Sequence, residues 1–180
     1  MFRRSLPAAV LALVPLATAP GQQPVEPFNG MDFKGWTLKD PKKPSWQTRG
    51  NPVVNPDNPE RFKVSERKDG DVPVLWNSTS GSDIFTEEKF GDITLELEFM
   101  VPKGSNSGIY LMGEYEVQIL DSYGKEKVGP GDLGGLYNAA APKVNAAKKP
   151  GEWQKFVIEF QAPKFEGDKK TANAKFVKVT

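Results

Sequence analysis

The stretch NSGIYLMGEYEVQILDSYG, residues 106–124, decides the fold. It holds two runs of alternating apolar residues, 109–112 and 115–120, with Gly113 between them. Alternation with a period of two is the pattern of a half-buried β-strand. We therefore expect strand structure in each run, with Gly113 between the two.

The second run carries a row of polar side chains. Successive strand residues point to opposite faces, so Glu114, Glu116 and Gln118 share one face while the other face is apolar. Such a row is either a solvated outer face or the floor of a polar cleft. The first interpretation is structural and the second is functional, and the pattern by itself fits both.

Other segments repeat the two-residue period between turns. In Ile93–Met100, four apolar residues alternate with Thr94, Glu96 and Glu98. Further strands are expected at 72–76, 153–160 and 175–180. No segment of helical length shows apolar residues at three-to-four spacing. Short strands separated by turn signals predict an all-β fold of antiparallel strands, a β-sandwich or jelly roll.

Three segments are expected to be irregular. Five prolines fall within residues 41–59, a density that excludes a helix and a central strand. Residues 125–151 contain five glycines and three prolines with little periodicity, and a loop of that length is usually functional or disordered. Residues 162–173 are predicted to form a polar loop.

Residues 1–19 have the pattern of a secretory signal peptide. Arg3 and Arg4 form a positive start, 6–16 is apolar, and 17–19 is an A-x-A cleavage site. The apolar run is too short to span a bilayer, so we expect no stable membrane anchor. The predicted organisation is signal peptide 1–19, linker 20–27 and one domain, 28–180. The predicted location is secreted or periplasmic.

Composition excludes several kinds of function. The net charge is +1 over 180 residues, and removal of residues 1–19, with two arginines and no acid, makes it −1. A near-neutral chain without a basic block gives no support for nucleic-acid binding. The chain has no His and no Cys, which excludes Ser-His-Asp, Cys-His and His-ligated zinc sites. Acid–base chemistry must use Asp, Glu, Tyr or Lys.

Several motifs in order resemble the 3-keto-disaccharide hydrolase domain family, formerly a domain of unknown function. They are FNG at 28–30, GW at 35–36, EEKFGDITLELEF at 87–99, NSGI at 106–109, YEVQILD at 115–121 and GEW at 151–153. The resemblance spans residues 28–180 and implies a concanavalin A-like jelly roll. Family members normally continue beyond the position of Thr180, so the last strands of the domain are expected to be missing.

The resemblance implies an exported hydrolase of 3-keto-glycosides, including 3-keto-disaccharides. A ketone at C3 of the sugar acidifies the proton at C2. A base removes that proton, the C1 substituent leaves by elimination, and water adds back. The route needs a base, a stabiliser for the enolate oxygen and an acid for the leaving group. A divalent metal can be the stabiliser. A sugar 3-dehydrogenase is the implied functional partner.

Glu116 is the first candidate for the base or for a metal ligand, and Asp121 at the strand end is a second catalytic candidate. The candidate substrate-binding residues are Asn106, Gln118, Tyr137 and Trp153. Four of these residues have a structural alternative: an exposed sheet face for Glu116 and Gln118, a turn cap for Asp121 and a core position for Trp153. The competing functions are a non-catalytic, lectin-like carbohydrate-binding module and a non-functional fragment.

Overall fold

The computed structural model describes residues 10–13, 17–18, 24–43, 45–78 and 82–180. Over these residues all regular structure is β-strand, and no helix is present that could cross a membrane. The strands are β1 (Val10–Leu13), β2 (Ala17–Thr18), β3 (Trp36–Leu38), β4 (Trp46–Asn55), β5 (Asn58–Ser65), β6 (Pro73–Asn77), β7 (Ile84–Thr86), β8 (Ile93–Met100), β9 (Asn106–Leu111), β10 (Tyr115–Leu120), β11 (Gln154–Gln161), β12 (Lys164–Glu166), β13 (Lys169–Ala172) and β14 (Lys175–Val179).

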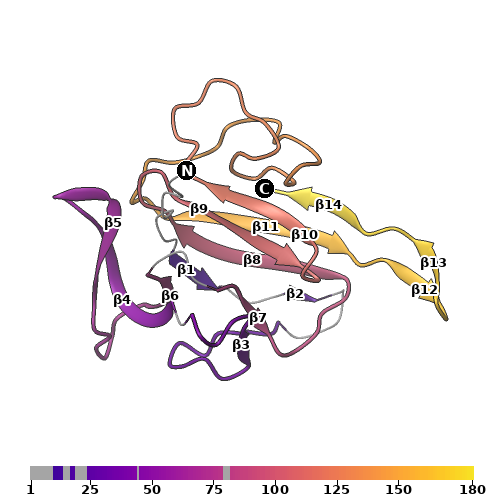
Figure 1. Ribbon diagram of the computed structural model, residues 1–180, viewed down its shortest axis with the longest axis horizontal. Helices are drawn as coiled ribbons and strands as arrows, with labels where there is room; N and C mark the ends of the chain where they lie inside the picture. Colours follow the sequence, from indigo (N-terminus) through magenta and orange to yellow (C-terminus); the bar gives the residue numbers. More distant parts are fainter. Residues whose placement is uncertain (1–9, 14–16, 19–23, 44, 79–81) are drawn as a thin grey trace.

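One large sheet organises the molecule. Its strand order is β14-β11-β8-β1-β6-β4-β5, with β2 also beside β8, and its strand pairs are antiparallel. Three short antiparallel pairs complete the described strands: β9 with β10, β12 with β13 and β3 with β7. The all-β, antiparallel fold class predicted from the sequence is confirmed (Figure 1).

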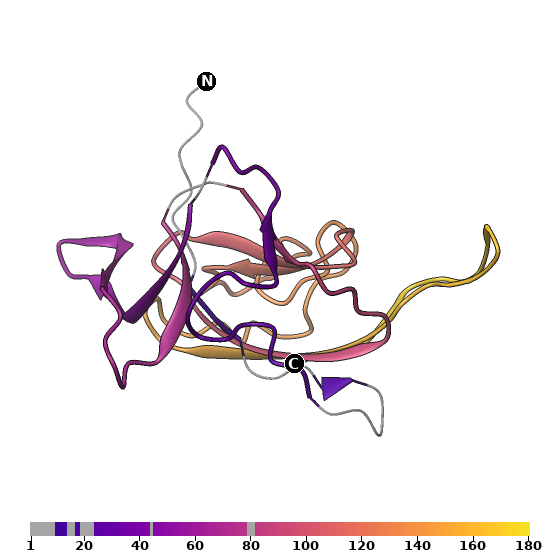
Figure 2. The same ribbon diagram turned by 90° about the horizontal axis from the view of Figure 1, so that it is seen from below.

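The β9–β10 hairpin forms a second layer over the β8 and β11 part of the sheet (Figure 2). The main core lies between the layers. Leu97 of β8, Ile158 of β11 and Val117 of β10 are at most 1% exposed. The rings of Phe99 and Phe156 join the two sheet strands, with centroids 4.8 Å apart. Each such side chain contributes about 1.5–3 kcal/mol by its burial.

The turn between β9 and β10 fixes the register of the hairpin. Met112 and Gly113 both take positive φ, 57° and 69°, and Glu114 N–H donates to Leu111 O at 3.2 Å. Turns with positive φ at both central residues match the twist of antiparallel strands, and glycine adopts this conformation at little cost. Glu114 therefore lies in the turn and is exposed, outside the polar row that continues along β10.

The strands with the clearest alternation are confirmed. Residues 93–100 and 115–120 coincide with β8 and β10, and the expected strands at 72–76, 153–160 and 175–180 match β6, β11 and β14 within one residue at each end. Residues 125–151 form no strand, as expected.

The expectation of irregular chain over residues 41–59 is wrong for most of the segment, because β4 covers Trp46–Asn55 and β5 begins at Asn58. The prolines occupy positions that a sheet tolerates. Pro52 lies at an irregularity between Gly50 and Val53, Pro56 in the connecting turn, and Pro59 on β5, which ends the sheet.

The expectation of a polar loop over 162–173 is also wrong. This segment forms the β12–β13 hairpin, which extends away from the main body in Figure 1. Its strand residues are exposed, so no apolar face marked it as sheet in the sequence.

The predicted signal peptide and linker fall largely outside the described residues. Of residues 1–23, the structure describes 10–13 and 17–18, which are β1 and β2. These two strands are part of the main sheet, β1 between β6 and β8 and β2 beside β8.

Candidate functional site

The outward face of the β9–β10 hairpin gathers most of the polar residues predicted from the sequence. In the hairpin register, Glu116 pairs with Tyr110 and Gln118 with Gly108, while Asn106 begins β9 two residues before Gly108. Directly paired residues of antiparallel strands share a face. Asn106, Glu116 and Gln118 therefore lie on one face with Tyr110, and the other face of the hairpin packs into the core.

Glu116 and Tyr110 form a hydrogen-bonded pair at the centre of this face. The Tyr110 hydroxyl donates to Glu116 Oε2 at 2.8 Å. Tyr110 is 51% exposed, and Glu116 is half-buried. The hydrogen bond to Glu116, with partial burial and the negative charges of Glu116 and Asp83, raises the pKa of Tyr110 to about 12. At neutral pH the tyrosine is therefore a protonated donor.

Gly108 makes room for the Glu116 carboxylate. A Cβ at position 108 would lie 2.1 Å from Glu116 Oε1 and 2.8 Å from its Cδ. The backbone of Gly108 does not need glycine, because its φ is not positive. Glycine at position 108 therefore leaves space for the Glu116 side chain, and the backbone conformation of β9 does not require it.

Gly108→Ala is expected to turn the Glu116 side chain away and break its bond with Tyr110, while the fold is kept. The added methyl group collides with a flexible side chain that can rotate, so the free energy of unfolding should change by less than about 1 kcal/mol. Thermal unfolding and the pKa of Tyr110, followed by ultraviolet difference absorption, measure the two effects. A Tyr110 pKa that stays at about 12 in the variant would contradict this assignment.

A loop segment lies along the free edge of β10. Gln118 N–H donates to Gly135 O at 2.9 Å, Gly134 N–H donates to Gln118 O at 2.9 Å, and Tyr137 N–H donates to Glu116 O at 3.1 Å. These bonds, with an isolated antiparallel bridge between Leu136 and Val117, hold residues 134–137 along the edge of β10. The backbone of Tyr137 is thereby held beside that of Glu116, and Tyr137 is 49% exposed.

Gln118 is buried beneath this loop. It is 2% exposed, and its Nε2 donates to Gly131 O at 3.2 Å. Its Oε1 is buried without a hydrogen-bond partner. In this conformation Gln118 holds the loop and does not present its amide to a sugar, so the predicted contact with substrate would require residues 131–135 to move.

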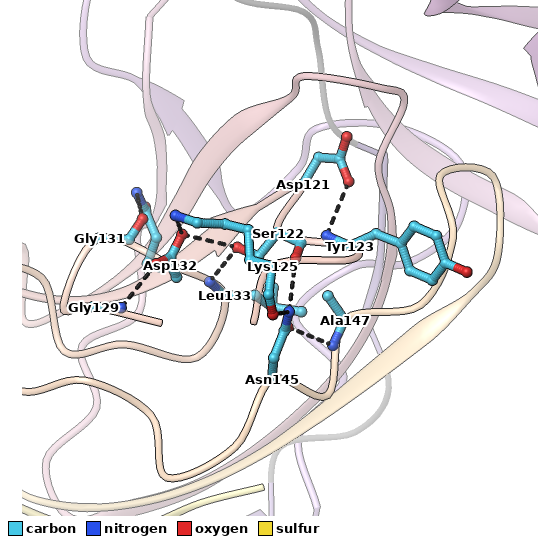
Figure 3. A network of polar contacts seen from close by, with 11 residues as sticks. Asp121, Ser122, Tyr123, Lys125, Gly129, Gly131, Asp132, Leu133, Asn145 and Ala147 are labelled. Atoms are coloured by element: carbon cyan, nitrogen blue, oxygen red, sulfur yellow. Dashed lines mark hydrogen bonds and ion pairs between the residues drawn. The ribbon is translucent and has the colours of Figure 1, made fainter. Parts of the chain in front are cut away.

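The base of the same loop is fixed by a buried carboxylate, Asp132, which is 5% exposed (Figure 3). Its Oδ1 accepts from Lys125 Nζ at 2.6 Å and from the Ser122 hydroxyl at 3.2 Å, and its Oδ2 accepts from Gly129 N–H at 2.8 Å. Burial acts to raise the pKa of Asp132, but these donors outweigh it and hold the pKa below the ordinary value of 3.8. Asp132 is therefore ionised at neutral pH.

Asn145 and Ser122 connect the network to the end of β10. Asn145 Nδ2 donates to Ser122 O at 2.8 Å and to Lys125 O at 2.9 Å, and Leu133 N–H donates to the Ser122 hydroxyl at 3.0 Å (Figure 3). These bonds connect Leu133 and Asn145 of the loop to Ser122, at the end of β10. No sequence pattern predicted this network, because residues 122, 132 and 145 share no strand period or motif.

Asp121 lies next to the network but is engaged by backbone groups. Its Oδ2 accepts from Gly104 N–H at 2.8 Å, and its Oδ1 accepts from Tyr123 N–H at 3.4 Å. Both bonds are those of a turn cap, and the first ties Asp121 to the turn between β8 and β9. Of the two interpretations of Asp121, this geometry favours the cap.

Trp153 lies apart from Glu116. It lines a cavity of about 400 Å³ whose lining residues include Glu98 and Val53. Glu98 alternates along β8 with the core residues Leu97 and Phe99, so this cavity opens on the face of the main sheet turned away from the hairpin. Trp153 also packs against a second, smaller core cluster. The structure therefore does not bring Trp153 into the predicted site.

Tyr110 and Gly108 are the site residues that the sequence analysis missed. The signal was present: once Gly113 is taken as the turn of a hairpin, residue 110 falls opposite residue 116 and residue 108 opposite 118. Alternation within each strand does not by itself show which residues of the two strands lie opposite one another.

The residues of this face do not form a protein ligand set for a metal. Across residues 10–13, 17–18, 24–43, 45–78 and 82–180, no three His, Cys, Asp or Glu side chains come together as a cation site. The Oε2 of Glu116 is already engaged by Tyr110. Within the described residues, Glu116 is therefore not part of a three-residue ligand set of this kind for a divalent metal.

The chain is similar to one protein family and to a solved structure. The family model of the 3-keto-alpha-glucoside-1,2-lyase-like domain matches residues 23–178. A crystal structure from Parabacteroides distasonis ATCC 8503, described as a "putative glycosyl hydrolase", is similar at 38% identity and a TM-score of 0.46. That match covers 51% of this chain and 42% of the other. No curated protein matches the sequence. Because the family model covers most of its length, the chain belongs to the 3-keto-alpha-glucoside-1,2-lyase-like domain family.

Proposed function

We propose that the chain is an exported enzyme that cleaves the glycosidic bond of 3-keto-glycosides, with a concanavalin A-like jelly roll as its scaffold. The observation that carries the proposal is the Glu116–Tyr110 pair, a carboxylate and a protonated phenol 2.8 Å apart on the outward face of a hairpin that lies within the residues matched by the family model. A base next to a neutral donor is what enolisation of a ketone requires.

The reaction proceeds in two stages. Glu116 removes the proton at C2, and the electron pair of that C–H bond forms an enolate with the C3 ketone. The enolate then forms the C1–C2 double bond and expels the C1 substituent, which gains a proton and leaves as an alcohol or a second sugar. Water then adds a hydroxyl at C1 and a proton at C2. One water is consumed for each bond broken, so the net reaction is hydrolysis.

Tyr110 supplies the neutral donor. With its pKa at about 12, its hydroxyl keeps its proton at neutral pH and can hydrogen-bond to the C3 oxygen as negative charge develops there. When Glu116 takes the C2 proton it loses its charge, and the bond from Tyr110 to Glu116 weakens. The donor is then released toward the enolate.

The flanks of the face fit the binding of a sugar. Tyr137 is half exposed and held beside the backbone of Glu116, so its ring can stack on a pyranose. Asn106 is exposed at the start of β9 and offers an amide to hydroxyl groups. The substrate's ketone must come from oxidation of a C3 hydroxyl, the reaction of a sugar 3-dehydrogenase.

The proposal is tested by incubating the chain with a 3-keto-disaccharide, with and without a divalent cation, and with the same disaccharide that lacks the ketone. We expect monosaccharide release from the keto sugar alone, because only its C2 proton is acidic. Release from both would indicate ordinary glycoside hydrolysis. Sugar binding without release, by a folded chain, would replace the enzyme with the carbohydrate-binding module.

Tyr110→Phe is expected to lower the rate of release about 10- to 100-fold while the KM for the keto sugar changes little. The variant loses a donor whose main action is on the transition state and keeps the aromatic ring. Initial rates over a range of substrate concentrations separate the two parameters. Tyr123→Phe, which removes the hydroxyl of another half-exposed tyrosine, is the matched control. An equal loss in both variants would contradict the role given to Tyr110.

A further inference from the structure

The main sheet contains a position for one strand between β6 and β8. β1 pairs antiparallel with both neighbours: Leu11 lies opposite Leu75 of β6 and Phe99 of β8, and Ala12 and Leu13 lie opposite Glu98 and Leu97. β6 and β8 have no pairing with each other. Residues 10–13 are thus the sole described link between the two halves of the sheet at this point.

The two flanking strands cannot close this position in the pattern of the rest of the sheet. Because each is antiparallel to β1, they run parallel to one another. Their direct pairing would be a parallel pair in a sheet whose described pairs are antiparallel. Without a strand between them, the backbone N–H and C=O groups that now bond to β1 would lose their partners, next to a buried core.

The strand position between β6 and β8, called the slot below, requires apolar residues. Leu75, Leu97 and Phe99, which lie opposite positions 11 and 13, are all buried. A strand that pairs here runs beside these buried side chains, so an apolar sequence is favoured over a charged one. The segment VLAL at residues 10–13 meets this requirement.

The same four residues belong to the apolar part of the predicted signal peptide. We propose that the space between β6 and β8 is a binding site for one extended apolar peptide segment. Residues 10–13 of the same chain fill it while they are present, and an apolar peptide in trans can occupy it when they are withdrawn. If residues 1–19 are removed as a signal peptide, residues 10–13 can no longer complete the sheet. This inference does not depend on the proposed enzymatic function.

The test uses the full chain with Leu11→Pro and Leu13→Pro, which prevent residues 10–13 from pairing. A labelled peptide with the sequence of residues 8–14 is titrated and its fluorescence anisotropy measured. We expect saturable binding to the variant and binding to the unaltered chain that is on the order of a hundredfold weaker, since the tethered segment competes at high effective concentration. The same peptide carrying proline at position 11 should bind neither chain. Equal binding to both chains, or no binding to a folded variant, would overturn the proposal.

A cross-link tests the slot without disturbing it, should the proline variant fail to fold. The chain has no cysteine, so Ala12→Cys with Glu98→Cys creates one pair at directly opposed positions. We expect an intrachain disulfide on mild oxidation. Ala12→Cys with Glu96→Cys is the control, because a diagonal pair about 7–8 Å apart is too distant to bridge. Absence of the first disulfide, or its formation between two chains, would show that residues 10–13 do not fill the slot of their own chain.

Discussion

Glu116→Gln is expected to lower the rate of monosaccharide release from a 3-keto-disaccharide by about 10²- to 10⁴-fold, the usual contribution of a general base. Glutamine has the shape of glutamate and can still accept the hydrogen bond from Tyr110, so the hairpin should keep its structure. It cannot take a proton from C2. Initial-rate measurements, with circular dichroism and thermal unfolding to verify the fold, give the result.

Glu114→Gln is the matched control for this prediction. Glu114 lies two residues earlier, exposed in the turn between β9 and β10. The same chemical change there should leave turnover within about twofold of the unaltered chain. A folded Glu116→Gln chain with full activity, or equal losses in the two variants, would remove Glu116 from the mechanism.

Asp132→Ala is expected to lower the free energy of unfolding by about 2–3 kcal/mol, since it leaves Lys125, Ser122 and Gly129 N–H without their acceptor. Lys125 is half exposed and can regain water, which keeps the loss below that of a fully buried pair. For a chain of this size the melting temperature should fall by roughly 5–10 °C. Thermal and urea unfolding measure the loss. Asp168→Ala, in the exposed turn between β12 and β13, should change little.

The effect of Asp132 should depend on pH in a defined direction. Its pKa is lowered in the folded chain, so its contribution is fully present above the ordinary value of 3.8 and is lost as pH falls through the lower folded-state value. The difference in unfolding free energy between the unaltered chain and Asp132→Ala should therefore narrow below pH 3.8. A difference that stays constant down to pH 2 would mean that the carboxylate charge is not what stabilises the loop.

Alternation alone predicted the strands that border the core. Residues 93–100 and 115–120 have one face buried, so the sequence carries the period directly. β12 and β13 have exposed residues on both faces, and no period marks them. For β4, the high proline content was misleading. Pro52 lies where the register between β4 and β5 is irregular, and the pairing continues on both sides of it. A proline's effect on a sheet depends on which edge its nitrogen faces, and that is a property of the assembled sheet.

The candidate site was predicted in part. Glu116 and Asn106 share the face that their strand positions imply. The predicted role of Gln118 depended on an open face, but the loop that contains Gly131, Gly134 and Gly135 covers it. Trp153 was assigned from its residue type, and its place on the other side of the main sheet follows from strand order, which no local pattern contains. Asp132 and Lys125 meet only because the loop folds back on itself.

The most direct test of the account is the fate of the C2 proton when a 3-keto-disaccharide is turned over in D₂O. Proton NMR follows the released keto sugar, with the product incubated alone to correct for spontaneous exchange. We expect the unaltered chain to give product carrying deuterium at C2 and Glu116→Gln to form it far more slowly, because elimination removes the original proton and hydration returns one from solvent. Product that keeps its C2 proton would contradict the account, since it would mean that C1 is attacked directly and that Glu116 does not act as a base at C2.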